Sequence, residues 1–406
     1  REIPRPLPDH PGNVFLTDEQ VSVDLPSGEA DLWQITDYDG RVVAEEEAED
    51  DRANAGRLPV GYFELRRANQ GGPMGGSVHL AVLAPLKAPT PADSPIAVDT
   101  GISWYWEQWN DAQRVGAVNL CALAGINWVR ERLRWSEVEP ESGRDLETTK
   151  YDETARLWSD AGLRVLQVHH SSARWANRRY LRFPRDLRDA CGFHRRMAER
   201  WKGQVLAFEA WNEADIERFG GHIGSEIAAL QKASYLGLKA GNPDVISCTN
   251  GFAHARPTIL ANFHENEAWP YFDKFNLHHY VGVDEYPGFY PRFRAASGGR
   301  PLWVTECNVW DTRRDRRLQA ERLPKIYAGA LHQGAEVVYY FLFRPWTDGR
   351  TSYGVIRKDL IPQPAYVAMA AAGRLLAGAH AVGRWRTDFD AVRAFVFRAE
   401  PDGKDR

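Results

Sequence analysis

From residue 96 onward, short apolar segments alternate with helical segments, and this rhythm constrains the fold more than any other feature of the chain. Eight apolar segments of strand length recur at Ile96–Ile102, Trp128–Leu133, Leu163–His169, Val205–Trp211, Val245–Thr249, Phe275–His279, Leu302–Thr305 and Val337–Phe343. Helical patterns such as Asp111–Ala124 and Arg185–Lys202 separate most of them. Strands that alternate with helices predict parallel βα units. Eight such units fit an α/β fold of the (β/α)8 (TIM) barrel type better than a doubly wound sheet.

Residues 14–85 show a different pattern, that of short β-strands. Val21–Leu25 and Trp33–Thr36 alternate between apolar and polar side chains, and Asp39-Gly40 is typical of a hairpin turn. Several short strands at this spacing predict a β-sandwich. Four prolines between residues 85 and 95 indicate a linker. We therefore expect an accessory β-sandwich domain with its linker at 1–95 and a catalytic barrel at 96–375.

The last residues, 376–406, return to a β pattern after the final barrel helix. Alternation is visible over residues 392–397, and Asp402-Gly403-Lys404 resembles the beginning of a hairpin turn. We predict that this tail supplies C-terminal strands that join the β domain.

Charge and apolar patterning exclude several classes of partner. The sequence carries 51 basic and 55 acidic side chains, a formal net charge of −4, which gives no reason to expect nucleic acid or anionic lipid as a partner. No run of about 18 apolar residues occurs, so we expect no membrane-spanning helix. Arg1 to Pro8 contain no apolar signal core, so an export signal was removed or never existed. Removal would favour a secreted or periplasmic location over a cytoplasmic one.

The motifs of several enzyme classes are missing. The four cysteines lie at least 57 residues apart, which excludes a CxxC metal or redox pair. The sequence contains no GxSxG, no P-loop and no GxGxxG that opens a helix. Aromatic residues are abundant, with 15 Trp, 15 Tyr and 17 Phe. They indicate either a large core or a cleft with flat, amphipathic walls, which would suit sugar rings.

Two of the predicted strands end in a glutamate. The fourth strand leads into Trp211-Asn212-Glu213, and the seventh ends at Thr305-Glu306. The C-terminal ends of barrel strands are where the active site of a (β/α)8 enzyme is built. A salt bridge at the rim would explain either glutamate alone. Two carboxyl groups across the mouth of one barrel can act as general acid and nucleophile on an acetal.

The residues around both glutamates resemble glycoside hydrolase clan A, the retaining (β/α)8 glycosidases. Residues 208–215, FEAWNEAD, are similar to the FExWNEPD of family 39, with Ala214 at the position of the proline. The remaining matches are Val129-Arg130, WSEVEP at 135–140, His278-His279-Tyr280 and PQPAY at 362–366. In extent the resemblance spans most of residues 96–375, and the β domain is similar to accessory domains of such enzymes.

This resemblance implies a role for four residues. Glu213 would be the acid/base, Glu306 the nucleophile, Asn212 would hold the 2-hydroxyl of the sugar, and Arg130 would lie beside the nucleophile. A cation near Glu306 would keep it ionised, and partly desolvated, aromatic surroundings would raise the pKa of Glu213 so that it begins protonated. Asn212 and Glu213 are adjacent, so both can face the cleft only if the strand end is bulged or already turning.

Two histidine pairs follow predicted strands. His278 and Tyr280 are two residues apart and share a face, so both can point inward near Glu306. Only one of His169 and His170 should face the site, and we assign His170. Each histidine could instead be a core residue with a capped ring. Neither pair forms an HxH chelate, and no Asp or Cys cluster accompanies them, so we predict no metal and no other cofactor.

Tryptophans after the first and eighth strands are candidate sugar platforms. They are Trp346 and either Trp104 or Trp106, of which we assign Trp104; each could equally belong to the core. Cations are also placed to bind an acidic sugar. Arg174, Arg344 and Arg350 lie on predicted rim loops, although solvated loops explain most arginines of this kind.

Together these patterns predict a retaining glycosidase that acts on a carbohydrate, a β-linked oligosaccharide or polysaccharide. A glycosidase of uronic-acid-containing glycans is the alternative favoured by the rim arginines and the family 39 likeness. A non-catalytic carbohydrate-binding barrel is an alternative of another class, and a metal-dependent barrel hydrolase is a third. The identity of the sugar, its anomeric configuration, exo or endo action and the oligomeric state stay open at this stage.

Overall fold

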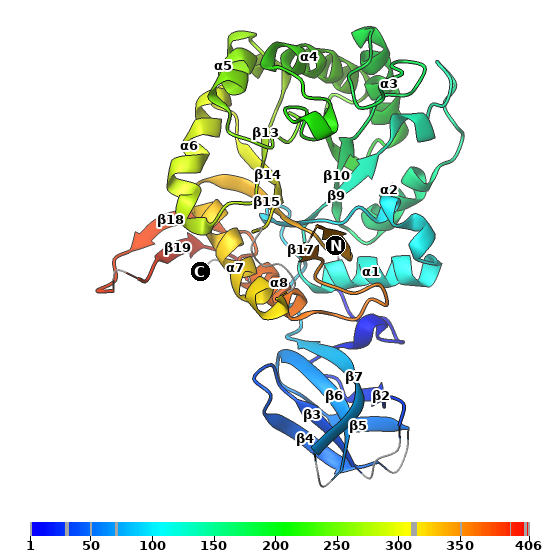
Figure 1. The fold of residues 1–406 in the computed structure, drawn as a ribbon, viewed down its shortest axis with the longest axis vertical. Helices are drawn as coiled ribbons and strands as arrows, with labels where there is room; N and C mark the ends of the chain where they lie inside the picture. The colour runs from blue at the N-terminus through cyan, green and yellow to red at the C-terminus, as the bar shows by residue number, and fades with distance from the viewer. Residues whose placement is uncertain are drawn as a thin grey trace.

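The computed structural model describes residues 2–28, 32–48, 51–69, 72–309, 315–349, 351–389, 391–401 and 404. A large domain with a central sheet surrounded by helices lies next to a small β domain formed by the N-terminal part of the chain (Figure 1). Among the described residues, no helix combines the length and the apolar character that crossing a bilayer requires.

The large domain is a (β/α)8 barrel, as predicted. Its parallel strands are β8 (Ile96–Asp99), β9 (Trp128–Leu133), β10 (Arg164–His169), β11 (Val205–Glu209), β12 (Ile246–Cys248), β13 (Phe275–His279), β14 (Leu302–Cys307) and β15 (Ala335–Phe341). They lie in the order β12-β11-β10-β9-β8-β15-β14-β13. Parallel bridges from Cys248 to Lys274 and from Phe252 to Leu277 close the sheet between β12 and β13.

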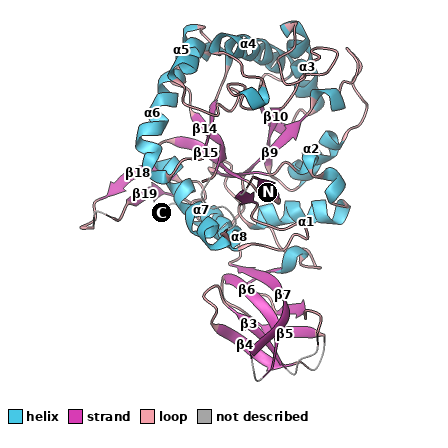
Figure 2. Cartoon of the chain, viewed as in Figure 1, coloured by secondary structure: helices cyan, strands magenta, loops and turns pink. Residues whose placement is uncertain are grey.

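Helices cover the outside of this barrel (Figure 2). They are α1 (Asp111–Leu123), α2 (Lys150–Asp160), α3 (Leu187–Arg200), α4 (Gly224–Gly241), α5 (Pro257–Glu265), α6 (Tyr286–Ala296), α7 (Arg316–His332) and α8 (Pro364–Leu375). Local sequence sets several of their starts. Thr149 caps α2 by accepting a hydrogen bond from the amide of Tyr151, and Asp152 accepts one from the amide of Thr149.

The barrel strands are buried on both faces. Side chains such as Val98 and Val304 pack outward under the helices, and a second layer that includes Trp128, Leu166 and Trp303 fills the interior. Layers of this kind make the barrel a packed core and not a pore. Because the interior is filled, a cavity can open only among the loops that follow the strands, where polar side chains gather.

The β domain consists of two sheets that share one core. The strands are β1 (Val14–Leu16), β2 (Val21–Asp24), β3 (Leu32–Thr36), β4 (Val42–Glu47), β5 (Arg52–Gly56), β6 (Gly61–Asn69) and β7 (Gly72–Leu83). One sheet has the order β1-β7-β6-β3-β4, and β2 pairs with β5 in the other. Trp33 and Ile35 alternate toward the common core, where Val21 and Val23 of the second sheet meet them. The predicted N-terminal sandwich is confirmed.

The prediction that residues 376–406 supply strands to the β domain is wrong. β18 (His380–Trp385) pairs with β19 (Ala394–Arg398), and this hairpin lies against α7 of the barrel (Figure 1). Phe395 stacks on His332 of α7 with ring centroids 4.3 Å apart. Alternation identifies a strand but not its partner, because every free sheet edge offers the same hydrogen bonds. Asp402 and Gly403 of the predicted turn lie outside the described residues.

Candidate active site

A cavity of about 390 Å³ opens at the C-terminal ends of the barrel strands. Seven of the predicted site residues line it: Trp104, His170, Asn212, Glu213, Tyr280, Glu306 and Trp346. The other two, Arg130 and His278, are fully buried and contact the lining residues from below. The structure therefore brings all of the predicted site residues together, at the end of the barrel where the strand order places them.

A bulge in β14 turns Glu306 into the barrel. Leu277 of β13 pairs with Val304, but the next residue of β13, His278, pairs with Glu306, so Thr305 is an extra residue on β14. The hydroxyl of Thr305 donates to Oε1 of Glu209 inside the barrel at 2.7 Å. In a regular strand Glu306 would then point outward, toward the helices. The bulge lets two successive side chains face the interior.

Glu306 is held as a carboxylate by its neighbours. Its Oε1 accepts hydrogen bonds from Nη1 of Arg130 at 2.5 Å and from Nη2 of Arg132 at 3.1 Å, and its Oε2 accepts one from the hydroxyl of Tyr280 at 2.8 Å. Burial alone would raise the pKa of Glu306. The positive charges of His278 and the two arginines, together with the tyrosine hydroxyl, outweigh burial and lower that pKa well below its usual range.

Glu213 lies beyond the end of its strand, as the adjacent pair Asn212-Glu213 requires. β11 ends at Glu209, and Glu213 has a left-handed backbone with φ of 45°. Its amide donates to the carbonyl of Gly251 at 3.1 Å, which ties this turn to the loop after β12. Asn212 is also bridged to Gly251. The turn sends both side chains into the cavity.

The surroundings of Glu213 favour its protonated form. Burial raises the pKa of this carboxyl, and the negative charge of Glu306 raises it further, although a hydrogen bond with His278 opposes them. Nδ1 of His278 lies 2.9 Å from Oε1 of Glu213, and its Nε2 lies 3.1 Å from Oγ1 of Thr305. Oxygens of Glu213 and Glu306 and a nitrogen of His278 all lie within 4.8 Å of one another.

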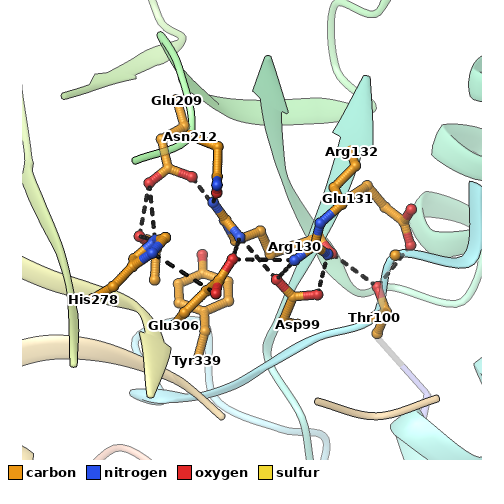
Figure 3. A network of polar contacts seen from close by, with 12 residues as sticks. Asp99, Thr100, Arg130, Glu131, Arg132, Glu209, Asn212, His278, Glu306 and Tyr339 are labelled. Carbon is orange, nitrogen blue, oxygen red and sulfur yellow. Dashed lines mark hydrogen bonds and ion pairs between the residues drawn. The ribbon is translucent and has the colours of Figure 1, made fainter. Parts of the chain in front are cut away.

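Arg130 is the centre of the polar network beneath the cavity (Figure 3). Its Nε donates to Glu209 at 2.7 Å, its Nη1 to Asp99 at 2.9 Å as well as to Glu306, and its Nη2 to Oδ1 of Asn212 at 2.7 Å. Burial opposes its charge, but the surrounding carboxylates raise the pKa of Arg130 well above its usual value. One rigid guanidinium thus orients both Asn212 and Glu306.

Sequence reasoning missed three members of this network: Asp99, Arg132 and Glu209. Arg132 pairs with both Asp99 and Glu306. A signal was present, because each of the three is a charged residue inside a segment otherwise apolar enough to be a buried barrel strand. Charged side chains at such positions are seldom buried unless they are paired.

The structure separates the paired candidates at the rim. His170 lines the cavity, whereas His169 faces outward and stacks on His194 of α3 with ring centroids 4.1 Å apart. Trp104 lines the cavity, whereas Trp106 packs under the guanidinium of Arg114.

The three arginines predicted on rim loops also differ in whether they line the cavity. Arg344 lines the cavity with the predicted residues, and Arg174 lies over the ring of Tyr180, outside it. Arg350 lies outside the described residues.

Glu213, His278 and Glu306 also form the one group of His, Cys, Asp and Glu side chains in the described part of the chain that is compact enough to hold a metal ion. Arg130 and Arg132 already place two positive charges on Glu306. Their repulsion of a further cation disfavours metal binding at this position.

No protein-family model matches the chain, and no curated protein matches its sequence. Solved structures do match its fold. A family 39 glycoside hydrolase from the gut symbiont Bacteroides cellulosilyticus WH2 superposes with a TM-score of 0.72 at 18% identity, over 97% of this chain and 86% of that one. The chain shares its fold.

Two further matches have lower scores. A family 39 β-xylosidase from Caulobacter crescentus has a TM-score of 0.53 at 16% identity, over 77% of this chain and 76% of the other. A family 30 endoxylanase from Clostridium papyrosolvens C71 has a TM-score of 0.55 at 14% identity, over 78% of this chain and 81% of the other. These likenesses establish the architecture, and the chemistry rests on the site itself.

Proposed function

We propose that this protein is a retaining glycosidase that hydrolyses a β-glycosidic bond in an oligosaccharide or polysaccharide. The observation that carries the proposal is a pair of neighbouring carboxyl groups, Glu213 and Glu306, with pKa values shifted in opposite directions. Groups whose surroundings separate their pKa values in this way are suited to be acid and nucleophile. One oxygen of each lies within 4.8 Å of the other, which favours the ~5–5.5 Å carboxyl spacing of retaining enzymes over the ~6.5–9.5 Å of inverting ones.

In the first step, a carboxylate oxygen of Glu306 attacks the anomeric carbon while the bond from that carbon to the leaving oxygen breaks. The proton of Glu213 passes to the leaving oxygen, so the leaving group departs as an alcohol. In the second step, Glu213 accepts a proton from water, which attacks the anomeric carbon and releases Glu306. Two inversions leave the sugar with its original configuration.

Asn212 and Arg130 support the sugar and the nucleophile in this proposal. Oδ1 of Asn212 is held by Arg130, which turns the amide nitrogen toward the cavity, where it can donate to a sugar hydroxyl. Trp104 and Trp346 add aromatic faces to the same lining. Aromatic rings offer sugar rings an apolar surface at low entropic cost. The β configuration is supported by the fold-related β-xylosidase.

The test is a panel of nitrophenyl β-glycosides of xylose, mannose, glucose and galactose, followed by proton NMR of the first anomer released. We expect hydrolysis of at least one member with retention of the β configuration. Release of the α anomer would contradict the double displacement. Binding of sugars without any hydrolysis would favour the carbohydrate-binding barrel, and loss of activity with a chelator would favour a metal-dependent hydrolase.

Arg344 favours a second candidate, a glycosidase of uronic-acid-containing glycans. This arginine is 4% exposed and lines the cavity. Its guanidinium lies over the rings of Tyr105 and Trp346, and its Nε donates to the carbonyl of Gly101 at 3.1 Å. Burial, together with the charge of Arg132, lowers the pKa of Arg344 to about 10. No carboxylate of the described residues forms an ion pair with it. A carboxylate on the sugar would complete such a pair.

A matched pair of substrates tests this second candidate. Nitrophenyl β-glucuronide and β-glucoside differ only in the carboxylate at C6. If the arginine binds that carboxylate, Arg344→Met should reduce kcat/KM for the glucuronide about tenfold or more relative to the glucoside. A ratio that stays constant would assign Arg344 a structural role and leave the neutral β-glycosidase as the function.

A further inference from the structure

A second cavity of about 420 Å³ adjoins the candidate active site. The two cavities share three lining residues, Trp104, His170 and Phe219. The second one continues between the loops after β9 and β10, where its lining includes Arg134, Arg174 and Tyr180. We call it the side cavity. Nothing in the proposed double displacement uses it.

Two buried polar atoms lack partners where the cavities meet. Trp104 and His170 pack edge to face with ring centroids 4.4 Å apart. Nε1 of Trp104 and Nε2 of His170 are buried and have no hydrogen-bond partner among the described residues. His170 is 6% exposed, and burial lowers its pKa far below the usual value, so its ring is neutral. A buried polar atom without a partner is unfavourable, and a ligand hydroxyl, which both donates and accepts, would satisfy either nitrogen once its ring turned that nitrogen toward the cavity.

The aromatic side chains of Trp104 and Tyr180 line the side cavity. Trp104 is at the junction, with the guanidinium of Arg134 4.6 Å from its ring centroid. Tyr180 lines the side cavity but not the active-site cavity; it is 45% exposed, with the guanidinium of Arg174 5.6 Å from its ring centroid. A large aromatic side chain left open beside a polar cavity is typical of a binding surface for an amphipathic ligand. A pyranose ring has this character, with apolar C–H faces and a polar edge.

We infer that the side cavity binds a second sugar unit, covalently linked to the unit in the candidate active site. Trp104 and His170, the wall that the two cavities share, would contact the sugar at the junction, and Tyr180 would pack against the next ring. The preferred substrate would therefore be an oligosaccharide and not a monosaccharide glycoside. This inference rests on the proposed glycosidase function.

The experiment compares chain lengths. The rates of hydrolysis of β-1,4-linked xylo-, manno- and gluco-oligosaccharides of two to five units are measured beside the nitrophenyl monoglycosides, for the unmodified chain and for Tyr180→Ala. For the series that reacts, kcat/KM for the longest oligosaccharide is divided by kcat/KM for the monoglycoside. This ratio should be about tenfold lower in Tyr180→Ala than in the unmodified chain, which corresponds to the loss of about 1.4 kcal/mol of binding. Trp385→Ala is the control, because Trp385 is an exposed aromatic (70%) that lines neither cavity.

An equal effect of Tyr180→Ala on all lengths, or a rate that does not rise with chain length in the unmodified chain, would contradict the second-unit site while leaving the glycosidase function intact. Hydrolysis of none of the glycosides would contradict the function itself. A crystal structure of Glu306→Gln soaked with the tetraose of the reactive series gives an answer independent of Tyr180→Ala. Sugar density against Trp104 and Tyr180 is expected, and a bound tetraose that leaves the side cavity empty would overturn the inference.

Discussion

Nη1 of Arg130 lies 2.5 Å from Oε1 of Glu306, in a pair whose side chains are 0% and 7% exposed. Charges attract more strongly where water is excluded. The same guanidinium also contacts Asp99 and Glu209. One buried cation thus holds the proposed nucleophile ionised and is itself held by two further carboxylates. The neighbouring Glu213 contacts neither Arg130 nor Arg132 in the described structure. Its surroundings therefore favour the protonated carboxyl, the opposite of the state of Glu306.

The first prediction concerns pH. The pKa of Glu306 is lowered and that of Glu213 is raised, so kcat/KM should be bell-shaped. Activity is lost at acid pH when Glu306 is protonated and at alkaline pH when Glu213 is deprotonated. Arg132→Gln removes one cation from Glu306. The pKa of Glu306 should then rise, and the acid limb should move to higher pH by about one unit.

Arg164→Gln is the matched control for this shift. Arg164 is the first residue of β10, at the opposite end of the barrel, where its guanidinium lies over Trp128. The pH profile of Arg164→Gln should coincide with that of the unmodified chain. An acid limb that stays in place in Arg132→Gln, or moves to lower pH, would show that Glu306 does not set it.

The second prediction concerns the nucleophile. Glu306→Gln keeps the shape of the side chain but replaces the carboxylate with an amide, which cannot form the covalent intermediate. Turnover should fall by more than about 10⁴-fold on every substrate, whatever the leaving group. Glu336→Gln is the same substitution at the other end of the barrel, where Glu336 pairs with Lys274, and it should retain activity. A substrate on which Glu306→Gln remains active would disprove the assignment.

The third prediction separates the acid/base from the nucleophile. In the proposed mechanism Glu213 donates a proton to the leaving oxygen, a task worth about 10²–10⁴-fold. Glu213→Ala should therefore strongly reduce the rate of hydrolysis of natural glycans. The first step on a dinitrophenyl glycoside should be nearly unchanged, because the departing phenol needs no proton. The second step would lack its base, so the covalent intermediate should accumulate. Azide, which needs no base, should restore turnover as a glycosyl azide. Equal losses on both substrates without rescue by azide would refute the role.

The barrel and the two glutamates were predictable because both are consequences of local pattern. Apolar segments of strand length alternate with helices, and the carboxyl ends of parallel strands meet at one end, so Glu213 and Glu306 had to approach each other. The segments Trp128–Leu133 and Phe275–His279 coincide with the strands observed. The predicted Val205–Trp211 runs two residues too far, because the chain leaves the sheet after Glu209 to make the turn that presents Glu213.

The remainder depends on contacts between distant parts of the chain. Thr305 is an extra residue only with respect to the pairing of β14 with β13. The local sequence Val304-Thr305-Glu306 does not by itself predict a bulge. Arg132 of β9 becomes part of the site only because the closed barrel brings Asp99 of β8 and Glu306 of β14 within reach of its side chain. The tail hairpin packs on α7 through an aromatic contact, and the alternation of apolar and polar residues in its strands does not predict that contact.

The last prediction tests how closely the backbone of the loop after β12 supports the site. A Cβ at Gly251 would collide with the ring of His278, including its Nε2. That ring is fixed on both sides, by Glu213 at Nδ1 and by Thr305 at Nε2, so it cannot move without breaking one of these hydrogen bonds. Gly251→Ala should displace His278 and with it the carboxyl of Glu213. Misplacement of a catalytic group by about 1 Å can cost about 10²-fold, and overpacking should destabilise the fold by about 1–3 kcal/mol.

Steady-state kinetics and thermal unfolding of Gly251→Ala test both effects, with Gly288→Ala as the control. Gly288 lies in α6, and a Cβ there meets nothing within 4 Å, so alanine should be neutral or slightly stabilising in this helix. The position of His278 can be followed separately, through the alkaline limb of the pH profile. Displacement of the ring removes the hydrogen bond that opposes the raised pKa of Glu213, so this limb should move to higher pH. A Gly251→Ala protein with unchanged kcat and an unchanged alkaline limb would show that the hydrogen bond between His278 and Glu213 does not position the acid/base.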